Sequence, residues 1–450
     1  MNAGFFVFYL LSLVCSGQII AQTHESLKSE NSSDLPAEVD LSKTIYFPPI
    51  ANQGLIGACD WFAVTYYQMT FMVNKQLKRK ATPEHTFSPQ FGYSFSCNAQ
   101  PFPYNIRVDD VYKFATKHGM GNMENIPYTM QNGTGYKVWC TDESIWEDAL
   151  KYRLAWYSYF TLNNKSNGAA YSLNSPEEFL YEVKRLLNDG EVLVIQSETH
   201  NGITSVIKND PSTIEDDELA GQQIIYEGNN GYDHSVAVVG YNDHIWYDAN
   251  NDDIVQPEEK GAIKIADSLG KDNPTSLNKG FHWMTYATFV NSIAENRVNR
   301  LILRENYSPK LICKITLNTA KRDKIKFQFG RSSTKRIEDI LANDSNVFDP
   351  YMLGYNPCTA GVSLIEGGDF AYDGGNAAKD GSFVFDLTDI YVPGSKDYWY
   401  MKISNSSTTN PCTIKKFEII NKENNKVITY TNLPVSLISE EEYLFIENEN

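Results

Sequence analysis

The chain is poor in basic residues and in long apolar runs. Its 450 residues include 39 Lys and Arg against 56 Asp and Glu, which gives a formal net charge of −17. Nucleic-acid-binding proteins present clustered positive charge, so this balance argues against a nucleic-acid partner. The apolar run near the N-terminus extends only from Phe5 to Val14 and is too short to span a bilayer. We therefore expect no membrane span.

That short apolar run fits a cleavable export signal over residues 1–21, with cleavage after Ala21. The polar residues 22–34 that follow are predicted to be a disordered lead. Export predicts a periplasmic, cell-surface or secreted protein. A lipid anchor at Cys15 is the second interpretation, because the bulky Val14 stands where lipoprotein signals have a small residue.

Cysteine is also scarce, with six residues left after the signal. Export permits disulfides, but a sequence does not give their connectivity. A cysteine that acts as a nucleophile has to stay free, which leaves an odd number for pairing. With Cys59 in that role, we predict the pairs Cys97–Cys140 and Cys358–Cys412 and a free thiol at Cys313.

The organisation of the chain changes near Arg300–Lys310. Before it, residues 35–300 mix helical patterns (61–77 and 175–190) with later short strand patterns (191–197, 235–242 and 262–268), which predicts an α+β domain. The helix over 61–77 is apolar on nearly every face and is expected to be buried. After it, residues 301–450 contain regular short strands separated by Gly, Asn, Asp and Ser, which predicts a β-sandwich domain.

A cysteine and a histidine stand at element starts in the first domain. Cys59 opens the apolar helix, six residues after Gln53, and His234 precedes a strand of small apolar residues. A helix N-terminus and a neighbouring imidazolium both favour a thiolate, which is the nucleophilic form of cysteine. A tetrahedral oxyanion then needs donors, and the Cys59 N–H and the Gln53 side-chain amide are suited to supply them. The alternative interpretation is a buried structural thiol and a structural histidine.

Four ordered blocks carry a resemblance to a known family: "QGLIGACDWFA", "FSPQFGYSFSC", "DHSVAVVGYN" and "GAIKIADSLG…NKGFHWMTY". They resemble the papain-like cysteine peptidases, and most closely the exported bacterial members. The resemblance covers about Leu35 to Phe289. It implies a helical lobe that carries the cysteine, a β-rich lobe that carries the histidine and a site between the two. It also implies that Gln53 is the oxyanion donor, Cys59 the nucleophile and His234 the general base and acid.

Two positions depart from the family pattern. The block that usually begins Asn-Ser-Trp-Gly begins here with Asp267, so the resemblance implies an aspartate as the residue that orients His234. Asp60 follows the nucleophile where the family mostly has an aromatic residue. An anion close to a thiolate opposes its formation. We expect Asp60 to be a solvated or capping side chain in the first helical turn.

A possible metal loop lies between the two strands expected to carry His234 and Asp267. The segment "DANNDDIVQPEE" resembles the calcium loop of EF-hands and dockerin-like repeats, although an aspartate replaces the glycine at its sixth position. A bound Ca²⁺ would have a structural role and would hold two catalytic elements relative to each other. An acidic solvated turn is the alternative. The expected ligands are Asp248, Asn250, Asp252, the Ile254 carbonyl, Gln256 and Glu259.

Together these features predict an exported cysteine peptidase that hydrolyses polypeptide substrates through a Cys59 acyl-enzyme and needs no organic cofactor. The β-sandwich would be an accessory module with a possible cell-surface or glycan partner. One alternative is an inactive papain-like protein that binds peptide or glycan at the cell surface. Another is a different Cys–His acyl transfer, such as an amidase or transglutaminase-like reaction.

Overall fold

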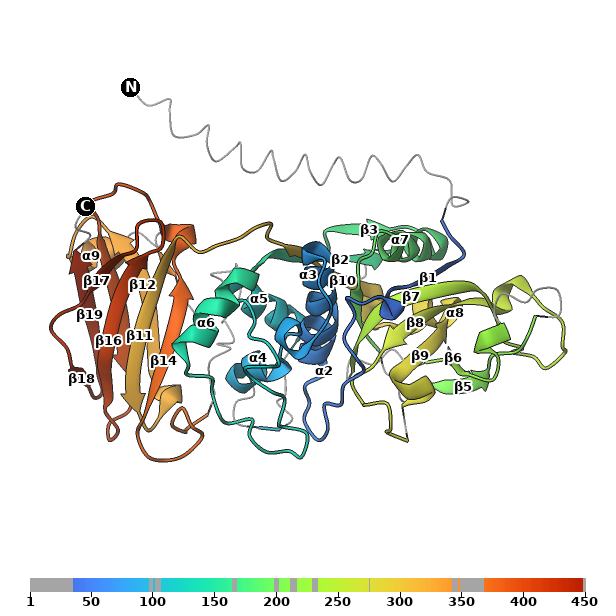
Figure 1. Cartoon of the computed structure of the whole chain (residues 1–450), viewed down its shortest axis with the longest axis horizontal. Helices are drawn as coiled ribbons and strands as arrows, with labels where there is room; N and C mark the ends of the chain where they lie inside the picture. The colour runs from blue at the N-terminus through green and yellow to red at the C-terminus, as the bar shows by residue number, and fades with distance from the viewer. Residues whose placement is uncertain are drawn as a thin grey trace, which may run out of the picture.

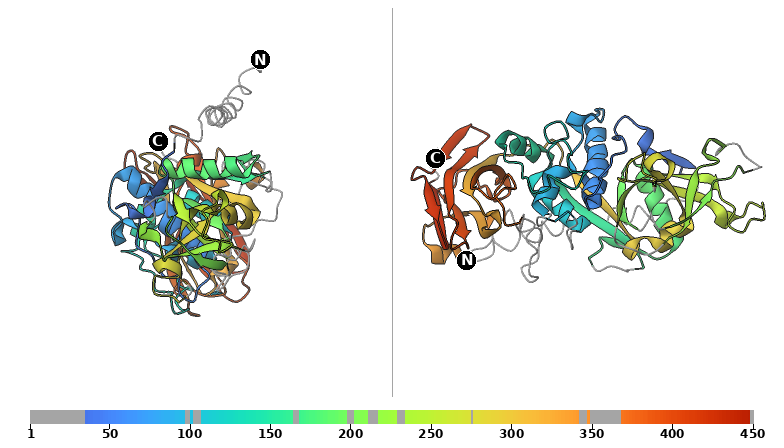
Figure 2. Two further views of the ribbon diagram at one scale, coloured as in Figure 1. Left: turned by 90° about the vertical axis from the view of Figure 1, so that its right-hand side faces the viewer. Right: turned by 90° about the horizontal axis from the view of Figure 1, so that it is seen from below.

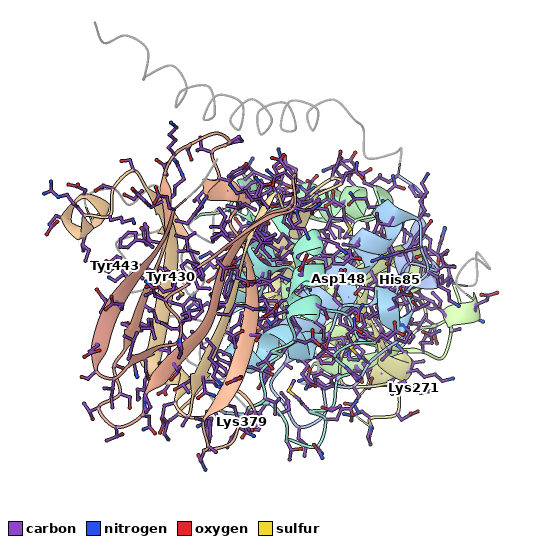
Figure 3. The ribbon with its side chains drawn as sticks, turned by 60° about the vertical axis from the view of Figure 1, so that its left-hand side comes forward. His85, Asp148, Lys271, Lys379, Tyr430 and Tyr443 are labelled. Atoms are coloured by element: carbon purple, nitrogen blue, oxygen red, sulfur yellow. The ribbon has the colours of Figure 1, made fainter. Side chains whose placement is uncertain are left out.

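The computed structural model describes residues 35–96, 100–101, 107–163, 168–197, 202–210, 217–228, 234–274, 276–341, 347–348 and 368–447. Three parts lie in a row: a β-sandwich, a helical lobe in the middle and a β-rich lobe (Figures 1 and 2). In a turned view, Tyr430 and Tyr443 lie on the sandwich and Asp148 lies on α6 (Glu143–Ala149) of the helical lobe beside it (Figure 3). The predicted export signal and disordered lead lie outside the described residues.

The helical lobe is built around one buried helix. Its first turn is α2 (Cys59–Trp61), a π-helical segment covers Phe62–Met69, and α3 (Thr70–Leu77) completes it. The chain turns away at Lys78, whose left-handed backbone conformation ends the helix. Every side chain of the π-helical segment is buried, as the unbroken apolar pattern predicts.

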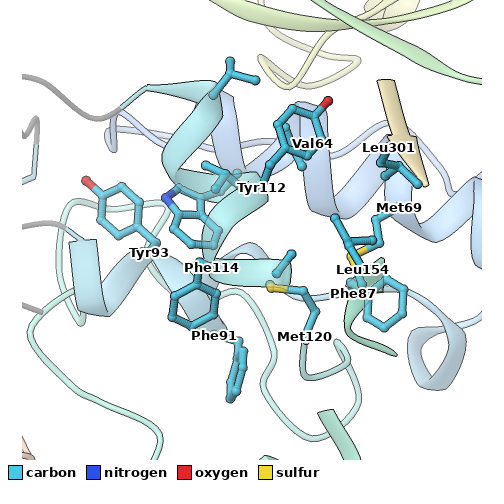
Figure 4. Packing of buried hydrophobic residues seen from close by; sticks show 14 of the residues in the cluster. Val64, Met69, Phe87, Phe91, Tyr93, Tyr112, Phe114, Met120, Leu154 and Leu301 are labelled. Atoms are coloured by element: carbon cyan, nitrogen blue, oxygen red, sulfur yellow. The ribbon is translucent and has the colours of Figure 1, made fainter. Parts of the chain in front are cut away.

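Two further helices pack against this central helix, α4 (Pro89–Ser96) and α5 (Val108–His118), and α6 packs on α4 through Trp146, which contacts Phe91 and Phe95. Val64 and Met69 of the central helix face a cluster that includes Phe91 of α4 and Phe114 of α5 (Figure 4). The Trp61 ring lies edge-on to Phe114, with ring centroids 5.3 Å apart. This packing holds the helix that begins at Cys59 inside the lobe.

The β-rich lobe is a ten-stranded sheet with the order β3-β2-β10-β4-β7-β8-β9-β6-β5, and β1 pairs with β7. Two helices pack against it, α7 (Pro176–Asn188), whose N-cap is Ser175, and α8 (Tyr286–Ser292). The strands are β1 (Glu38–Asp40), β2 (Leu154–Leu162), β3 (Tyr171–Leu173), β4 (Leu193–Gln196), β5 (Ile203–Val206), β6 (Gln223–Glu227), β7 (Ser235–Trp246), β8 (Lys260–Ala266), β9 (Phe281–Thr285) and β10 (Arg297–Leu303).

The sandwich consists of a five-stranded sheet, β14-β11-β16-β17 with β18 beside β16, and a four-stranded sheet, β13-β12-β15-β19. A short helix, α9 (Ile337–Leu341), lies between β12 and β13 in the chain. The strands are β11 (Leu311–Thr319), β12 (Ile325–Ser332), β13 (Val347–Phe348), β14 (Lys379–Asp386), β15 (Tyr398–Asn405), β16 (Cys412–Asn421), β17 (Lys426–Thr429), β18 (Val435–Leu437) and β19 (Glu440–Glu447).

The fold is therefore α+β, with a helical lobe and a β-rich lobe followed by an all-β sandwich, which confirms the predicted fold class. The chain leaves the ten-stranded sheet after Leu303 and enters the sandwich at Leu311. The domain boundary predicted between residues 300 and 301 thus falls inside β10, and the connection between the two domains follows this strand. Among the described residues, no helix is long and apolar enough to cross a membrane.

Neither predicted disulfide is seen among the described residues. Cys140 and Cys412 are free thiols, and their expected partners, Cys97 and Cys358, lie outside the described residues. Cys412 and the free Cys313 are fully buried in paired strands of one sandwich sheet. Burial raises the pKa of Cys140 to about 11 and that of Cys412 to about 12. These thiols are therefore protonated at neutral pH and are poor nucleophiles.

Candidate active site

Cys59 is the first residue of the central helix and is partly exposed, whereas the helix behind it is buried. The turn before it is held by two backbone bonds, from Gly57 N–H to the Pro101 carbonyl and from Ala58 N–H to the Ile56 carbonyl. The sulfur therefore stands at the positive end of a helix that extends to Leu77. A thiol at this position is accessible and has a favourable field for a thiolate.

His234 and Asp267 meet because of the register of two neighbouring strands. His234 immediately precedes β7 and Asp267 immediately follows β8, and these antiparallel strands pair Ala237 with Ala266. The pairing brings the start of one strand beside the end of the other. His234 Nε2 lies 2.9 Å from Asp267 Oδ1, and both side chains are buried.

The charges of this pair support each other. Burial alone would lower the pKa of His234, but the charge and hydrogen bond of Asp267, followed by those of Cys59, raise it well above its ordinary value. Burial alone would raise the pKa of Asp267, but the His234 charge and hydrogen bond outweigh it and lower that pKa to about 2. Asp267 and Cys59 thus both favour the protonated form of the imidazole.

Gln53 is attached to the loop that follows Asp267. Its backbone N–H donates to the Ser268 carbonyl at 2.7 Å, and its side-chain Oε1 accepts from the Ser268 hydroxyl at 2.5 Å. Its Nε2 donates to the Ile56 carbonyl at 3.0 Å. A primary amide has two N–H groups, so one stays available for an oxyanion.

The chain next to Gln53 requires glycine. Gly54 has a φ of +64°, and a Cβ there would lie 2.1 Å from the Gln131 carbonyl oxygen. Only glycine combines that backbone angle with so close an approach. The backbone conformation of Gly54 therefore fixes the position of Gln53 at the start of this turn.

Three further residues contact the site, and sequence patterns assign none of them a role. The Tyr67 hydroxyl donates to the Asp267 carbonyl at 2.8 Å and accepts from the Ala51 N–H at 3.1 Å. His282 Nε2 lies 3.7 Å from Asp267 Oδ2, and Ser268 holds Gln53 as described above. Tyr67 stood inside an apolar helix and His282 inside a strand, so neither gave a signal beyond burial.

The expectation for Asp60 was wrong. Its side chain is neither solvated nor a helix cap, because the residue is only 9% exposed and its Oδ1 accepts a hydrogen bond from the Ser235 hydroxyl. Burial raises the pKa of Asp60 to about 6, against the lowering effect of the Ser235 bond and of the His234 charge. The sequence could not show that the residue after the cysteine meets the residue after the histidine.

The loop from Asp248 to Glu259 has the backbone of a tight turn, with positive φ at Asn251 and Asp253. Two Asp248 oxygens accept the N–H groups of Asp252 and Asp253, at 3.1 Å each. Glu259 Oε1 accepts from the Ala249 N–H at 2.9 Å. Asp253 therefore adopts the left-handed conformation that glycine usually supplies at the sixth position.

Several of the expected Ca²⁺ ligands are bonded to other groups of the chain. The Lys208 ammonium lies 2.5 Å from Asp248 Oδ2 and 2.9 Å from Asp253 Oδ1, and thus takes the place of a cation. Asp252 Oδ2 accepts the side-chain amides of Asn250 and Gln256. The described residues contain no group of three or more His, Cys, Asp or Glu arranged to hold a metal ion. The loop in this arrangement does not fit Ca²⁺, and calcium stays a prediction.

Comparison with known proteins adds a distant structural likeness. No family model matches the chain, and no curated protein matches it. A solved structure that is similar is the Amb a 11 cysteine protease, a major ragweed pollen allergen, in its proform. The TM-score is 0.40 with 14% sequence identity, over 62% of this chain and 70% of that one. The function proposed below depends on the side chains of the site and not on this likeness.

Proposed function

We propose that this chain is an exported papain-like cysteine peptidase with Cys59 as nucleophile, His234 as general base and acid, and Asp267 as the residue that orients His234. The observation that carries the proposal is the His234 imidazole, which interacts with Cys59 and is bonded at Nε2 to the buried Asp267. These groups come from two lobes and from three separate parts of the sequence. A buried structural histidine would not need a partly exposed thiol as a neighbour.

The reaction follows from the arrangement. The Cys59 thiolate attacks the carbonyl carbon of a peptide bond, a C–S bond forms, and the carbonyl oxygen becomes an anion. The Cys59 N–H and the second amide N–H of Gln53 donate to that anion. The C–N bond then breaks as the His234 imidazolium gives its proton to the leaving amine, which leaves a thioester.

Hydrolysis of the thioester restores the site. Neutral His234 takes a proton from water, the resulting hydroxide attacks the thioester carbon, and the C–S bond breaks. The products are a carboxylic acid and the Cys59 thiolate beside the His234 imidazolium. In the resting enzyme Asp267 is ionised, because the His234 imidazolium and its hydrogen bond lower its pKa to about 2.

Digestion of a peptide library tests this function. The wild type is expected to produce new N-termini, Cys59→Ala to produce none, and Cys140→Ala to match the wild type, because Cys140 is a free thiol elsewhere in the helical lobe. Unchanged peptide lengths with a transferred acyl group would contradict hydrolysis and support an amidase or transglutaminase-like reaction. No product with the wild type, together with no labelling of Cys59 by an epoxide thiol inhibitor, would support the inactive binding protein.

We also propose that the enzyme works outside the cytoplasm, a proposal supported by the sequence of residues 1–21 alone. Fractionation of producing cells tests it. Recovery of a chain without those residues in the periplasm or medium is expected, whereas a full-length cytoplasmic chain would contradict it.

A further inference from the structure

A second carboxylate stands beside the proposed catalytic pair. Asp60 directly follows Cys59 in the helical lobe, and Ser235 directly follows His234 in the β-rich lobe. The Ser235 hydroxyl donates a hydrogen bond to Asp60 Oδ1, and both residues are buried. One bond therefore joins the two lobes immediately next to the two residues whose separation matters for the reaction.

We propose that Asp60 is a positioning residue: its carboxylate holds Ser235 across the lobe boundary and, together with Asp267, keeps the His234 imidazole protonated. This inference rests on the proposed function. Asp267 is hydrogen-bonded to His234 Nε2. Asp60 acts on the imidazole through its charge and through its hydrogen bond with Ser235, the residue after His234. Two buried carboxylates, Asp267 and Asp60, thus interact electrostatically with His234.

The surroundings of Asp60 explain why its charge acts on His234. The other groups that face Asp60 come from α5, where Asp109 and Asp110 both oppose its negative charge. Asp109 is paired with Arg297 of β10, with 2.6 Å between Nη2 and Oδ1, and Asp110 lies 3.4 Å from the Lys113 ammonium. Those acids are already neutralised by their own partners. Among the groups that face Asp60, the His234 imidazolium is the cation that its charge stabilises.

Ionisation of Asp60 gives the effect a direction in pH. The pKa of Asp60 is about 6, because burial raises it. Above that pH the carboxylate is charged and favours the imidazolium, and below it this support is lost. Replacement of Asp60 by asparagine removes the charge at every pH and keeps an oxygen that can accept the Ser235 hydrogen bond. Replacement of Ser235 by alanine removes the bond and keeps the charge.

These two variants separate charge from position in a test that needs no peptide substrate. Alkylation of Cys59 by iodoacetate, an anion, is fastest when the thiolate stands beside an imidazolium. Its rate should therefore rise and then fall with pH, and the upper limb reports the loss of the His234 proton. Mass spectrometry of the Cys59 peptide distinguishes this thiol from the other cysteines.

Asp60→Asn is expected to move the upper limb to lower pH by about 1 unit, the usual effect of one nearby opposite charge. Ser235→Ala should leave that limb unmoved and lower the maximal rate. Asp110→Asn, which removes a carboxylate that has its own lysine, should match the wild type. Thermal melts of all three variants establish that they are folded.

An upper limb that stays in place in Asp60→Asn would overturn the proposal, and so would an unchanged maximal rate in Ser235→Ala. Failure of the proposed function looks different. If His234→Ala alkylates with the same rates and pH profile as the wild type, the Cys–His pair itself is wrong. Wild-type alkylation that depends on His234, without peptide hydrolysis, would leave the pair intact and contradict only the peptidase.

Discussion

The helical lobe meets its two neighbours through different kinds of interface. Towards the sandwich, aromatic packing is combined with fixed ion pairs. The Trp146 ring of α6 packs on Phe383 and Phe385 of β14, with centroids 5.6 and 5.9 Å apart, and Glu143 and Glu147 of α6 pair with lysines of the sandwich. At the catalytic groups, the contact with the β-rich lobe is made by side-chain hydrogen bonds, from Ser268 to Gln53 and from Ser235 to Asp60.

The ions of the two interfaces also differ. Arg153 contacts Asp386 and Asp389 of the sandwich at 2.7 and 2.6 Å, and its guanidinium is buried with Asp386. That pair has no proton to exchange at neutral pH, because arginine stays charged. The groups at the other interface are histidine, cysteine and carboxylates, which titrate. The buried pair on the sandwich side therefore stays charged at neutral pH, whereas the β-rich side holds groups whose protons can move.

The largest effect is expected at the sandwich interface. Arg153→Ala leaves the buried Asp386 without its cation, which should lower the free energy of unfolding by about 3–5 kcal/mol. Urea unfolding measures it. The matched control is Lys151→Ala, whose pair with Asp148 is solvent-exposed and is expected to contribute about 0–1 kcal/mol. Equal losses in both variants would show that the buried pair at the sandwich interface contributes no more than an exposed pair.

A loss of activity with little loss of stability is expected on the other side. Gln53→Ala removes one oxyanion donor and should lower kcat by about 10²–10³-fold. Peptide hydrolysis measures it, with unfolding followed in parallel. The exposed neighbour Asn52 supplies the control, since Asn52→Ala should change kcat by no more than about twofold. A wild-type kcat in Gln53→Ala would contradict the role of Gln53 as an oxyanion donor.

The buried carboxylate of Asp60 should lower the free energy of unfolding of the protein relative to an uncharged side chain at this position. A buried carboxyl whose folded pKa is raised from 3.8 to about 6 costs stability above the folded value, and this cost disappears below the unfolded value. Asp60→Asn should therefore stabilise the protein by about 3 kcal/mol at mildly alkaline pH and by nothing in strong acid. Unfolding followed across pH checks the sign. A variant that is less stable than the wild type at alkaline pH would contradict it.

The smallest effect concerns the acidic loop. Since the Lys208 ammonium already pairs with Asp248, millimolar Ca²⁺ should leave the melting temperature of the wild type unchanged. Lys208→Gln should melt lower than the wild type, because it removes the cation between two carboxylates. A clear rise of the wild-type melting temperature with Ca²⁺, reversed by a chelator, would show that calcium displaces Lys208 and would support the predicted site.

Much of the fold followed from local pattern. The apolar helix that starts at Cys59 and the amphipathic α7 with its Ser175 cap form where periodicity and capping predict them. The strands of the sandwich after Leu311 were also predictable, because the alternation of apolar and polar residues can be recognised within each short segment. The meeting of His234 with Asp267 was accessible only through the resemblance, because strand register joins residues that are far apart in sequence.

What could not be predicted depends on contacts between residues that are far apart in the sequence. Asp60 looked like an ordinary first-turn carboxylate, and only its bond with Ser235 shows otherwise. Lys208 was unremarkable in sequence, yet its ammonium lies among the oxygens that were expected to bind calcium. Disulfide pairing was not predictable for a similar reason, since spacing does not tell which thiols are brought together.

The most direct test of the central claim is the ultraviolet absorbance of a thiolate at neutral pH, measured as the difference between the wild type and Cys59→Ala. The account predicts the absorbance of about one thiolate, and its loss in His234→Ala. No thiolate absorbance in the wild type, or the same absorbance without His234, would contradict the pairing of these two side chains across the lobes.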